Sequence, residues 1–220
     1  GRGEPITDSA IVISSMVDAV MLRLSSHEDI VEFSKHSSKP VINALSDESH
    51  PCQILADLMT YQEEKGSIQG KKIAWIGDGC NVCQTYMQAA EIFDFELSIA
   101  TPAGYEPSEA FSQKYKKNIN FFNNPMQACQ EADVVVTDVW TSMGQESEKK
   151  QRESSFKGFQ VDQLMMNQAK ADAIFMHCLP AYRGIEVSSE VIDGSQSVVW
   201  SEAENRLHAQ KSLLLYLIED

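Results

Sequence analysis

The sequence has no long apolar run and few positive charges. No apolar stretch approaches the roughly 20 residues that a helix needs to cross a bilayer, and the first residues lack the charged-then-apolar pattern of a signal peptide. The 220 residues include 18 Lys and Arg against 32 Asp and Glu, giving a formal net charge of −14. Nucleic-acid binding usually needs a basic face, and acidic surfaces disfavour anionic membranes. We therefore expect neither partner.

Cysteine is also scarce, and the number of cysteines is odd. The five are Cys52, Cys80, Cys83, Cys129 and Cys178. A disulfide framework is not expected in a chain of this size, so a reducing compartment and a cytoplasmic location fit better. Cys80 and Cys83 form a C-x-x-C, but no second pair accompanies it, and no Asp/Glu/His cluster has metal spacing. We expect no metal. A redox dithiol stays open beside the favoured interpretation, two thiols on a turn and a helix start.

What the chain does have is a regular alternation of short apolar runs and helical patterns. Nearly continuous apolar runs of this kind are typical of strands in a parallel sheet that is covered on both faces. We predict an α/β, doubly wound sheet over residues 66–200, with a closing helix at 202–218. The predicted strands are 72–76, 95–100, 119–122, 133–137, 173–176 and 197–200, and the helices between them include 81–93, 108–117 and 125–131.

The first 50 residues are less complete. They hold two strand candidates, 19–22 and 40–42, and a stretch at 25–35 that can be helical. That is too little for an independent sheet core. This segment therefore packs on the main domain or is the remainder of a larger one. A helix over 50–65, with apolar residues at helical spacing, follows it.

Ligands of open α/β sheets bind beyond the carboxyl ends of the strands, so the turns after the strands are candidate sites. The turn from Gly77 to Val82 begins like the dinucleotide fingerprint G-x-G-x-x-G, but Val82 replaces the third glycine and no acidic residue stands at 98–102. An NAD-dependent oxidoreductase is therefore a weak rival. Asn81 in this turn either offers its amide to a small polar ligand or caps a helix.

Two further turns carry polar side chains. Asp138 follows the strand at 133–137 and suits a cationic amine, unless it caps a turn. His177 and Cys178 follow the strand at 173–176. Neighbouring residues on an extended chain point to opposite sides, so these two cannot form a close Cys–His dyad. A covalent thiol mechanism is disfavoured.

Anion-binding groups are also present. His50 stands at a helix start followed by Pro51, and helix N-termini attract anions. Arg23 follows the first short strand, and Arg206 lies in the closing helix. A guanidinium group matches phosphate through paired hydrogen bonds, although most arginines are solvated surface residues.

Taken together and in order, these motifs resemble the ornithine-type members of the aspartate/ornithine carbamoyltransferase family. Aspartate-type members typically carry His-Pro-Leu-Pro where this sequence has His177-Cys178-Leu179-Pro180. The matching segments are Gly3-Glu4-x-Ile6-x-Asp8, His50-Pro51-x-Gln53-x-Leu55-Ala56-Asp57, Asp138-Val139-Trp140-x-Ser142-Met143-Gly144, His177-Cys178-Leu179-Pro180 and Glu204-Asn205-Arg206.

The resemblance implies a reaction of arginine metabolism. The uncharged δ-amine of L-ornithine would attack the carbonyl carbon of carbamoyl phosphate, giving citrulline and phosphate with no cofactor or metal. It also implies a homotrimer. The implied carbamoyl phosphate residues are Arg23, His50, Gln53, Cys178, Leu179 and Arg206, of which Arg23, His50, Cys178 and Arg206 would be catalytic. The implied ornithine residues are Asn81, Asp138, Ser142 and Met143.

The resemblance further predicts the domain organisation. Residues 1–50 would be the remainder of a carbamoyl-phosphate-binding domain, completed by the C-terminal helix 202–220. Residues 51–65 would be a linking helix, and 66–200 the ornithine-binding domain. The family's Ser-Thr-Arg-Thr-type phosphate loop has no match in the sequence. If nothing precedes Gly1, we expect carbamoyl phosphate binding to be severely weakened and trimer formation to be in doubt.

Two alternatives stay open within this resemblance. The chain could act on another amine such as putrescine, or it could bind ornithine without catalysing the transfer. Comparing ornithine, putrescine and acetylornithine as acceptors separates the first alternative from the expected reaction. Ornithine binding without turnover would support the second.

Overall fold

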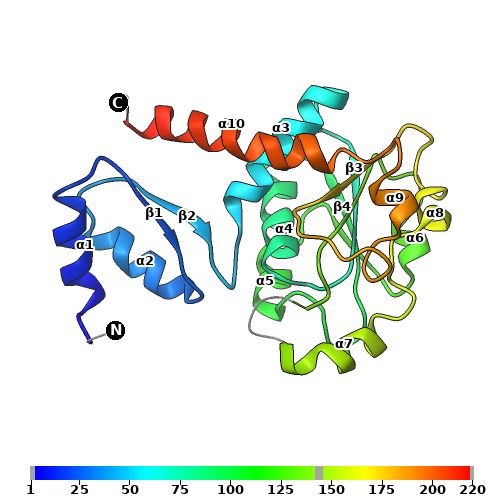
Figure 1. The fold of residues 1–220 in the computed structure, drawn as a ribbon, viewed down its shortest axis with the longest axis horizontal. Coiled ribbons are helices and arrows are strands. Elements are labelled where there is room, and N and C mark those ends of the chain that lie inside the picture. Colours follow the sequence, from blue (N-terminus) through cyan, green and yellow to red (C-terminus); the bar gives the residue numbers. More distant parts are fainter. Residues whose placement is uncertain (1–2, 142–145, 219–220) are drawn as a thin grey trace.

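The chain forms a small and a large α/β unit, connected along one side by two helices (Figure 1). The computed structural model describes residues 3–141 and 146–218. The small unit has a two-stranded sheet and the large unit a five-stranded sheet. The strands are β1 (Val20–Arg23), β2 (Val41–Leu45), β3 (Lys72–Ile76), β4 (Glu96–Ala100), β5 (Ile119–Phe122), β6 (Val134–Thr137) and β7 (Ile174–His177).

Helices follow most of the strands, as an α/β chain requires. They are α1 (Ile6–Ser14), α2 (His27–His36), α3 (Pro51–Lys65), α4 (Asn81–Phe93), α5 (Glu109–Lys114), α6 (Pro125–Cys129), α7 (Lys149–Ser155), α8 (Gln163–Met166), α9 (Ser189–Ile192) and α10 (Val199–Ile218), with a short 3-10 turn η1 (Glu146–Glu148) before α7. Within the described ranges, no helix is both long and apolar enough to cross a membrane.

The five-stranded sheet is parallel throughout and has the strand order β5-β4-β3-β6-β7. From β3 the chain adds β4 and then β5 toward one edge of the sheet. It then crosses back and adds β6 and β7 on the other side of β3. Every residue of β6 and β7 is buried, which explains their continuous apolar sequences. The predicted doubly wound sheet is confirmed, and its switch point lies between β3 and β6.

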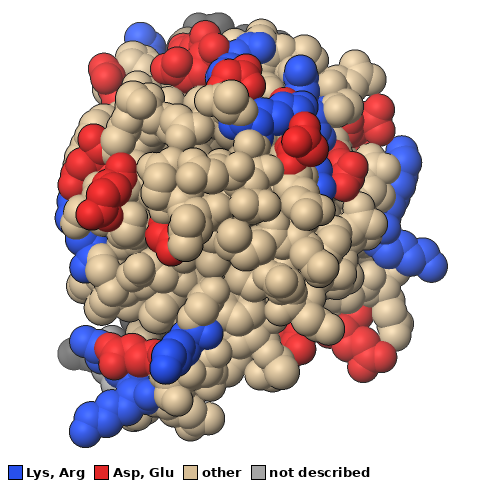
Figure 2. Space-filling model, turned by 90° about the vertical axis from the view of Figure 1, so that its right-hand side faces the viewer, with Lys and Arg blue, Asp and Glu red and all other residues tan. Residues whose placement is uncertain are grey.

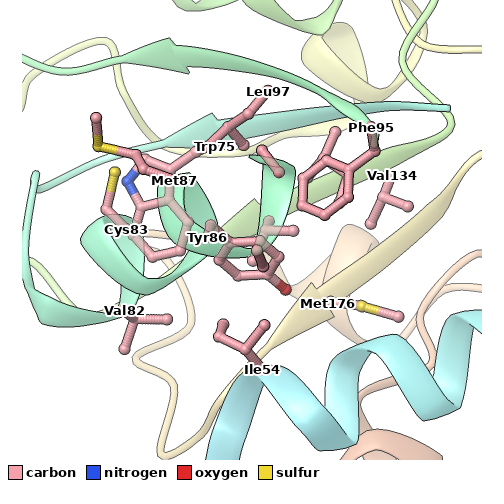
Figure 3. Close-up of a cluster of buried hydrophobic side chains, with 14 of the residues drawn as sticks. Ile54, Trp75, Val82, Cys83, Tyr86, Met87, Phe95, Leu97, Val134 and Met176 are labelled. Atoms are coloured by element: carbon pink, nitrogen blue, oxygen red, sulfur yellow. The ribbon is translucent and has the colours of Figure 1, made fainter. Parts of the chain in front are cut away.

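The core of the large unit is split between the two faces of this sheet. Successive residues of a strand point to opposite faces. Trp75 accordingly packs under α4 with Tyr86 and Phe95 (Figure 3). Phe175 belongs to the second cluster, on the other face, which includes residues of α6, α8 and α9. Burial on both faces makes this unit self-supporting.

The small unit has a much smaller core. Its strands pair in parallel, with Val20 opposite Val41. Its buried cluster consists of Ala10, Val20 and Phe33. The α2 helix is capped at its start by Ser26, whose hydroxyl accepts a hydrogen bond from the Asp29 N–H at 3.1 Å. This capping satisfies one of the free amides at the helix start.

One predicted strand is wrong. The 197–200 run is not a strand: Ser197 forms a single bridge with Phe175, and α10 already begins at Val199. Short apolar runs cannot distinguish a strand from a buried helix end. Trp200 is 61% exposed, as suits the outer side of a helix. The closing helix therefore starts three residues before the predicted Glu202.

The helices α3 and α10 lie side by side and connect the two units (Figure 1). The buried amide of Asn205 donates to the Thr60 hydroxyl at 2.9 Å and to a Glu63 carboxylate oxygen at 2.7 Å. On the far side of the large unit, basic and acidic side chains lie near one another around a broad uncharged area (Figure 2). This face therefore shows no extended basic surface of the kind nucleic acids need.

Candidate functional site

The turn after β3 is shaped by close packing. Gly77 has a φ of 137°, a region that favours glycine. A Cβ on Gly79 would collide with the backbone of Glu106 and Pro107. Backbone conformation at Gly77 and packing against the neighbouring loop at Gly79 thus explain the two glycines of the apparent dinucleotide fingerprint. The structure adds no support to the oxidoreductase alternative.

Asp138 lies across the switch point from this turn and accepts hydrogen bonds from two thiols. One carboxylate oxygen is 3.1 Å from Cys178 Sγ and 2.7 Å from the Val139 backbone N. The other oxygen is 3.7 Å from Cys80 Sγ. The side chain is 7% exposed and forms no salt bridge among the described residues. A buried carboxylate held only by thiols and one amide can still attract a cationic ligand.

The thiols themselves stay protonated. Burial, followed by the charge of Asp138, raises the pKa of Cys178 and Cys80 well above the usual range. Burial likewise raises the pKa of Cys83. Cys80 precedes the first residue of α4 and Cys83 lies in its first turn, so the interpretation as a turn and a helix start is confirmed. Thiols of this kind are poor nucleophiles and poor redox groups.

His177 is fully buried, and the hydrogen-bond partners of its ring are Leu179 and Glu186, not Cys178. Its Nδ1 accepts a hydrogen bond from the Leu179 N–H at 2.9 Å, so Nε2 carries the proton and faces Glu186 at 3.2 Å. The ligand atoms of Asp138, His177 and Cys178 lie within 4.8 Å of one another. Because both ring nitrogens form hydrogen bonds, His177 has no free lone pair for a metal ion. Only Asp138 and Cys178 of this cluster remain as possible ligands. Two are fewer than a protein metal site normally uses.

Leu179 has a φ of 54°, which is rare for a bulky residue. Such a conformation costs about 1 to 3 kcal/mol and is typical of functional sites. The hydrogen bond from its N–H to His177 helps to hold it. The turn after β7 is therefore fixed beside Cys178 at the carboxyl edge of the sheet.

His50 directly precedes α3, in the segment that joins the two units, and is buried. Its backbone N–H donates to the Thr85 hydroxyl at 2.8 Å, and its buried Nδ1 has no hydrogen-bond partner among the described residues. Burial, then Arg206 and Arg23, lowers its pKa to about 4. His50 is therefore a neutral imidazole close to two guanidinium groups. It can donate one hydrogen bond without carrying charge.

Gln53 lies one turn into α3 and holds one of these guanidinium groups. Arg206 Nη1 on α10 donates to Gln53 Oε1 at 2.7 Å. The buried Nε of Arg206 has no partner among the described residues, whereas Arg23, at the end of β1, is exposed. The structure thus brings His50, Gln53 and Arg206 together at the start of a 15-residue helix. Such a helix start favours anions.

Asn81 connects this set to the large unit. Its amide nitrogen donates to the Ser46 carbonyl oxygen at 2.7 Å, and its Oδ1 accepts from the Val82 N–H at 2.9 Å. The loop between β2 and α3 therefore lies against the start of α4. Asn81 is the first residue of α4 and not its cap, which is Cys80, so the predicted cap role is wrong, and its contact with a ligand stays a prediction. Ser142 and Met143 lie outside the described residues.

Sequence reasoning missed two buried polar groups at this site. Arg152 on α7 donates to Asp78 at 2.7 Å and to the Trp140 carbonyl oxygen at 3.0 Å. Asp57 and Glu202 surround the Gln53 amide. The available signal is spacing: Gln53 and Asp57, like Glu202 and Arg206, are four residues apart on one helix face.

Comparisons with known proteins agree with this geometry. The family model for the Asp/Orn-binding domain of aspartate/ornithine carbamoyltransferases matches residues 69–217, and the model for the carbamoyl-P-binding domain matches residues 1–63. The chain belongs to the aspartate/ornithine carbamoyltransferase family. The resemblance drawn from the motifs is confirmed.

Relatives in this family are similar over nearly the whole chain. The ornithine carbamoyltransferases of Ruthia magnifica and Nitrosococcus oceani are 64% and 58% identical over 99% of the chain. The chain covers 73% and 72% of their respective lengths. Solved structures of the ornithine carbamoyltransferases from Burkholderia thailandensis and Pyrococcus furiosus superpose with TM-scores of 0.91 and 0.92 at 48% and 47% identity. These superpositions cover 99% of the chain and 71% and 72% of those structures.

Proposed function

We propose that this chain transfers the carbamoyl group of carbamoyl phosphate to the δ-amine of L-ornithine, giving L-citrulline and phosphate. The observation that carries this proposal is that two polar sets lie on either side of the contact between the loop before α3 and the start of α4. A neutral His50 lies beside Arg206 and Arg23, and the Asp138 carboxylate lies at the sheet edge opposite. The names of the relatives support the same reaction.

The first set suits carbamoyl phosphate. Arg23 and Arg206 would bind its phosphate together with the amides at the start of α3. The neutral His50 would donate a hydrogen bond to the carbonyl oxygen, which becomes more negative as the amine attacks. Gln53 uses its amide on protein groups, so its support for Arg206 is the role that the hydrogen bonds favour. Its direct contact with the carbamoyl group stays a prediction.

The second set suits ornithine. Asp138 would accept the charged α-amino group, with Asn81, Ser142 and Met143 completing the contacts. Cys178 and the Leu179 carbonyl would lie near the reacting amine. The protonated Cys178 thiol holds Asp138 in place at 3.1 Å without competing as a nucleophile. This division predicts the domain organisation stated above, with α10 completing the carbamoyl phosphate unit.

The chemical step needs placement more than reactive groups. The uncharged δ-nitrogen attacks the carbonyl carbon, a C–N bond forms, and the bond to the phosphate oxygen breaks. The leaving phosphate takes the electron pair and can accept the proton that the amine releases. Holding both substrates at one site supplies most of the acceleration of such a step. No cofactor enters this scheme.

The experiment that tests the proposal is a citrulline assay of the purified protein with Asp138→Asn. Loss of the carboxylate charge should lower kcat/KM for ornithine by about 100-fold, because the α-amino group loses its counter-charge. Asp193→Asn, an exposed carboxylate far along the chain, is the matched control.

Three acceptor amines sharpen this assay. Putrescine has no carboxylate and acetylornithine has no free α-amine, so both should react poorly. A wild-type protein that prefers putrescine would contradict the choice of substrate. Ornithine binding without citrulline would contradict catalysis.

A homotrimeric assembly and a cytoplasmic location are part of this proposal. Support for an interface comes from exposed apolar side chains in and after α1, where Ile11 is 58% exposed and Met16 69% exposed. Light scattering of the purified protein measures the assembly directly. A monomeric mass at micromolar concentration would contradict the trimer.

A further inference from the structure

Two buried carboxyl groups lie behind the groups that face the substrates. Asp57 on α3 is 3% exposed and Glu202 on α10 is 1% exposed. The same nitrogen, Nε2 of Gln53, donates to Asp57 Oδ1 at 2.8 Å and to Glu202 Oε1 at 3.0 Å. One amide therefore joins both carboxyl groups and also, through its oxygen, Arg206. The reverse orientation of the amide would set its oxygen against two acceptors.

Further donors fix the outer oxygens of the pair. The Tyr86 hydroxyl, whose ring lies in the core cluster of Figure 3, donates to Asp57 Oδ2 at 2.7 Å. The His177 backbone N–H donates to Glu202 Oε2 at 2.8 Å. The network thus reaches from α4 and the end of β7 to Arg206. Among the described residues, the Gln53 amide is the one side chain that hydrogen-bonds both to the carboxyl pair and to the Arg206 guanidinium group.

Two carboxylates this close and this buried cannot both be ionised at low cost. Burial raises the pKa of Asp57 to about 6 and that of Glu202 well above its usual range. Burial also keeps the surrounding Tyr86 and Cys178 neutral by raising their pKa values. The pair therefore shares a single negative charge, and the Tyr86 hydroxyl that donates to Asp57 favours placing that charge on Asp57. That charge matches the single positive charge of Arg206.

We propose that Asp57 and Glu202 are positioning residues that share one proton, with Glu202 as the protonated member, and that fix Arg206 through Gln53 for carbamoyl phosphate. This inference rests on the proposed function. It adds that the binding of carbamoyl phosphate depends on one buried negative charge. The role is distinct from simple helix packing, because the same two helices are also joined by Asn205 and Thr60, away from Gln53.

The test compares three variants of the purified protein. Asp57→Asn removes the charge, Glu202→Gln imitates the protonated acid, and Thr60→Val removes a buried hydroxyl from the same helix pair as a control. Carbamoyl phosphate binding is measured by calorimetry, and KM and kcat by citrulline formation. Infrared spectroscopy at neutral pH detects the carbonyl band of a buried, protonated carboxyl group.

We expect Asp57→Asn to weaken carbamoyl phosphate binding and raise its KM about tenfold or more, with a smaller change in KM for ornithine. Glu202→Gln should change binding by about threefold or less and abolish the infrared band, since a neutral group is retained there. Thr60→Val should keep both the band and the KM values.

The inference would be overturned if Asp57→Asn and Glu202→Gln weakened carbamoyl phosphate binding equally. An unchanged KM for carbamoyl phosphate in Asp57→Asn would also overturn it. So would the absence of the band in the wild type. A wild type that binds carbamoyl phosphate but forms no citrulline would overturn the proposed reaction alone, because calorimetry and the infrared band still report on the carboxyl pair.

Discussion

The two units of this chain use the same alternation of strand and helix but differ in how much they bury. The large unit buries side chains on both faces of five strands, whereas the small unit has two strands and a three-residue core. Exposed apolar residues such as Ile11 and Met16 gather in the small unit. The difference shows that the strand-and-helix pattern alone does not make an independent domain. The small unit relies on α3 and on contacts beyond its own sheet.

Two ion pairs, one in each unit, also differ in how deeply they are buried. The ion pair between Arg152 and Asp78 in the large unit is buried, with side chains 7% and 10% exposed. The pair between Lys39 and Asp18 in the small unit is exposed, at 41% and 78%. Removing one partner of a buried ion pair lowers the stability of the folded protein strongly, whereas removing one partner of an exposed pair lowers it little. A polar substitution at the exposed pair of the small unit should therefore cost little stability.

The largest expected effect comes from a matched pair of core truncations. Phe175→Ala, in the second core cluster, should lower the free energy of unfolding by about 3 to 5 kcal/mol. Phe33→Ala, in the small core, should change the free energy of global unfolding less. Its main effect should be more frequent local unfolding of residues 5–45. Denaturant unfolding measures the first effect, and amide hydrogen exchange the second.

Similar losses of global stability in both variants would contradict the comparison. They would mean that the two units unfold as one cooperative body, with the small unit as tightly coupled as the sheet of the large one. An intermediate in the denaturation of Phe33→Ala would instead support the conclusion that the two units differ in stability.

The second prediction concerns the buried ion pair. Asp78→Asn should cost about 2 to 3 kcal/mol, since Arg152 stays buried and loses one carboxylate but keeps Glu148 and the Trp140 carbonyl. Asp18→Asn, at the exposed pair of the small unit, should not change the denaturation midpoint measurably. Equal midpoints for both variants would show that the burial of the Arg152 pair brings no stability.

These differences also explain what could be predicted from the sequence. The strands of the large unit were predictable because sheets covered on both faces require continuous apolar runs, as in 133–137. The run at 197–200 was misassigned because burial on one side only, with Trp200 exposed, is invisible in a short segment. Motif residues such as His50 and Asp138 were found because they stand next to element ends.

The buried carboxyl pair could not be found in this way. Asp57 and Glu202 are far apart in the sequence, and nothing in either helix pattern shows that both face the same amide. A carboxylate within a helix is usually a solvated surface residue. Only the packing of α3 on α10 brings them together.

The smallest expected effect lies where the two units meet, at His50. Its pKa is about 4 in the folded protein and about 6.5 when unfolded, so between these values the unfolded chain binds the extra proton. Stability from the neutral His50 is complete above pH 6.5 and declines as the pH falls toward 4. Relative to His50→Gln, the wild type should lose about 1 kcal/mol between pH 7 and about pH 5.5. Asp57 titrates with the opposite sign but is present in both proteins, so it cancels in this difference. A difference between wild type and variant that stays constant with pH would mean that His50 is solvated rather than buried as a neutral imidazole.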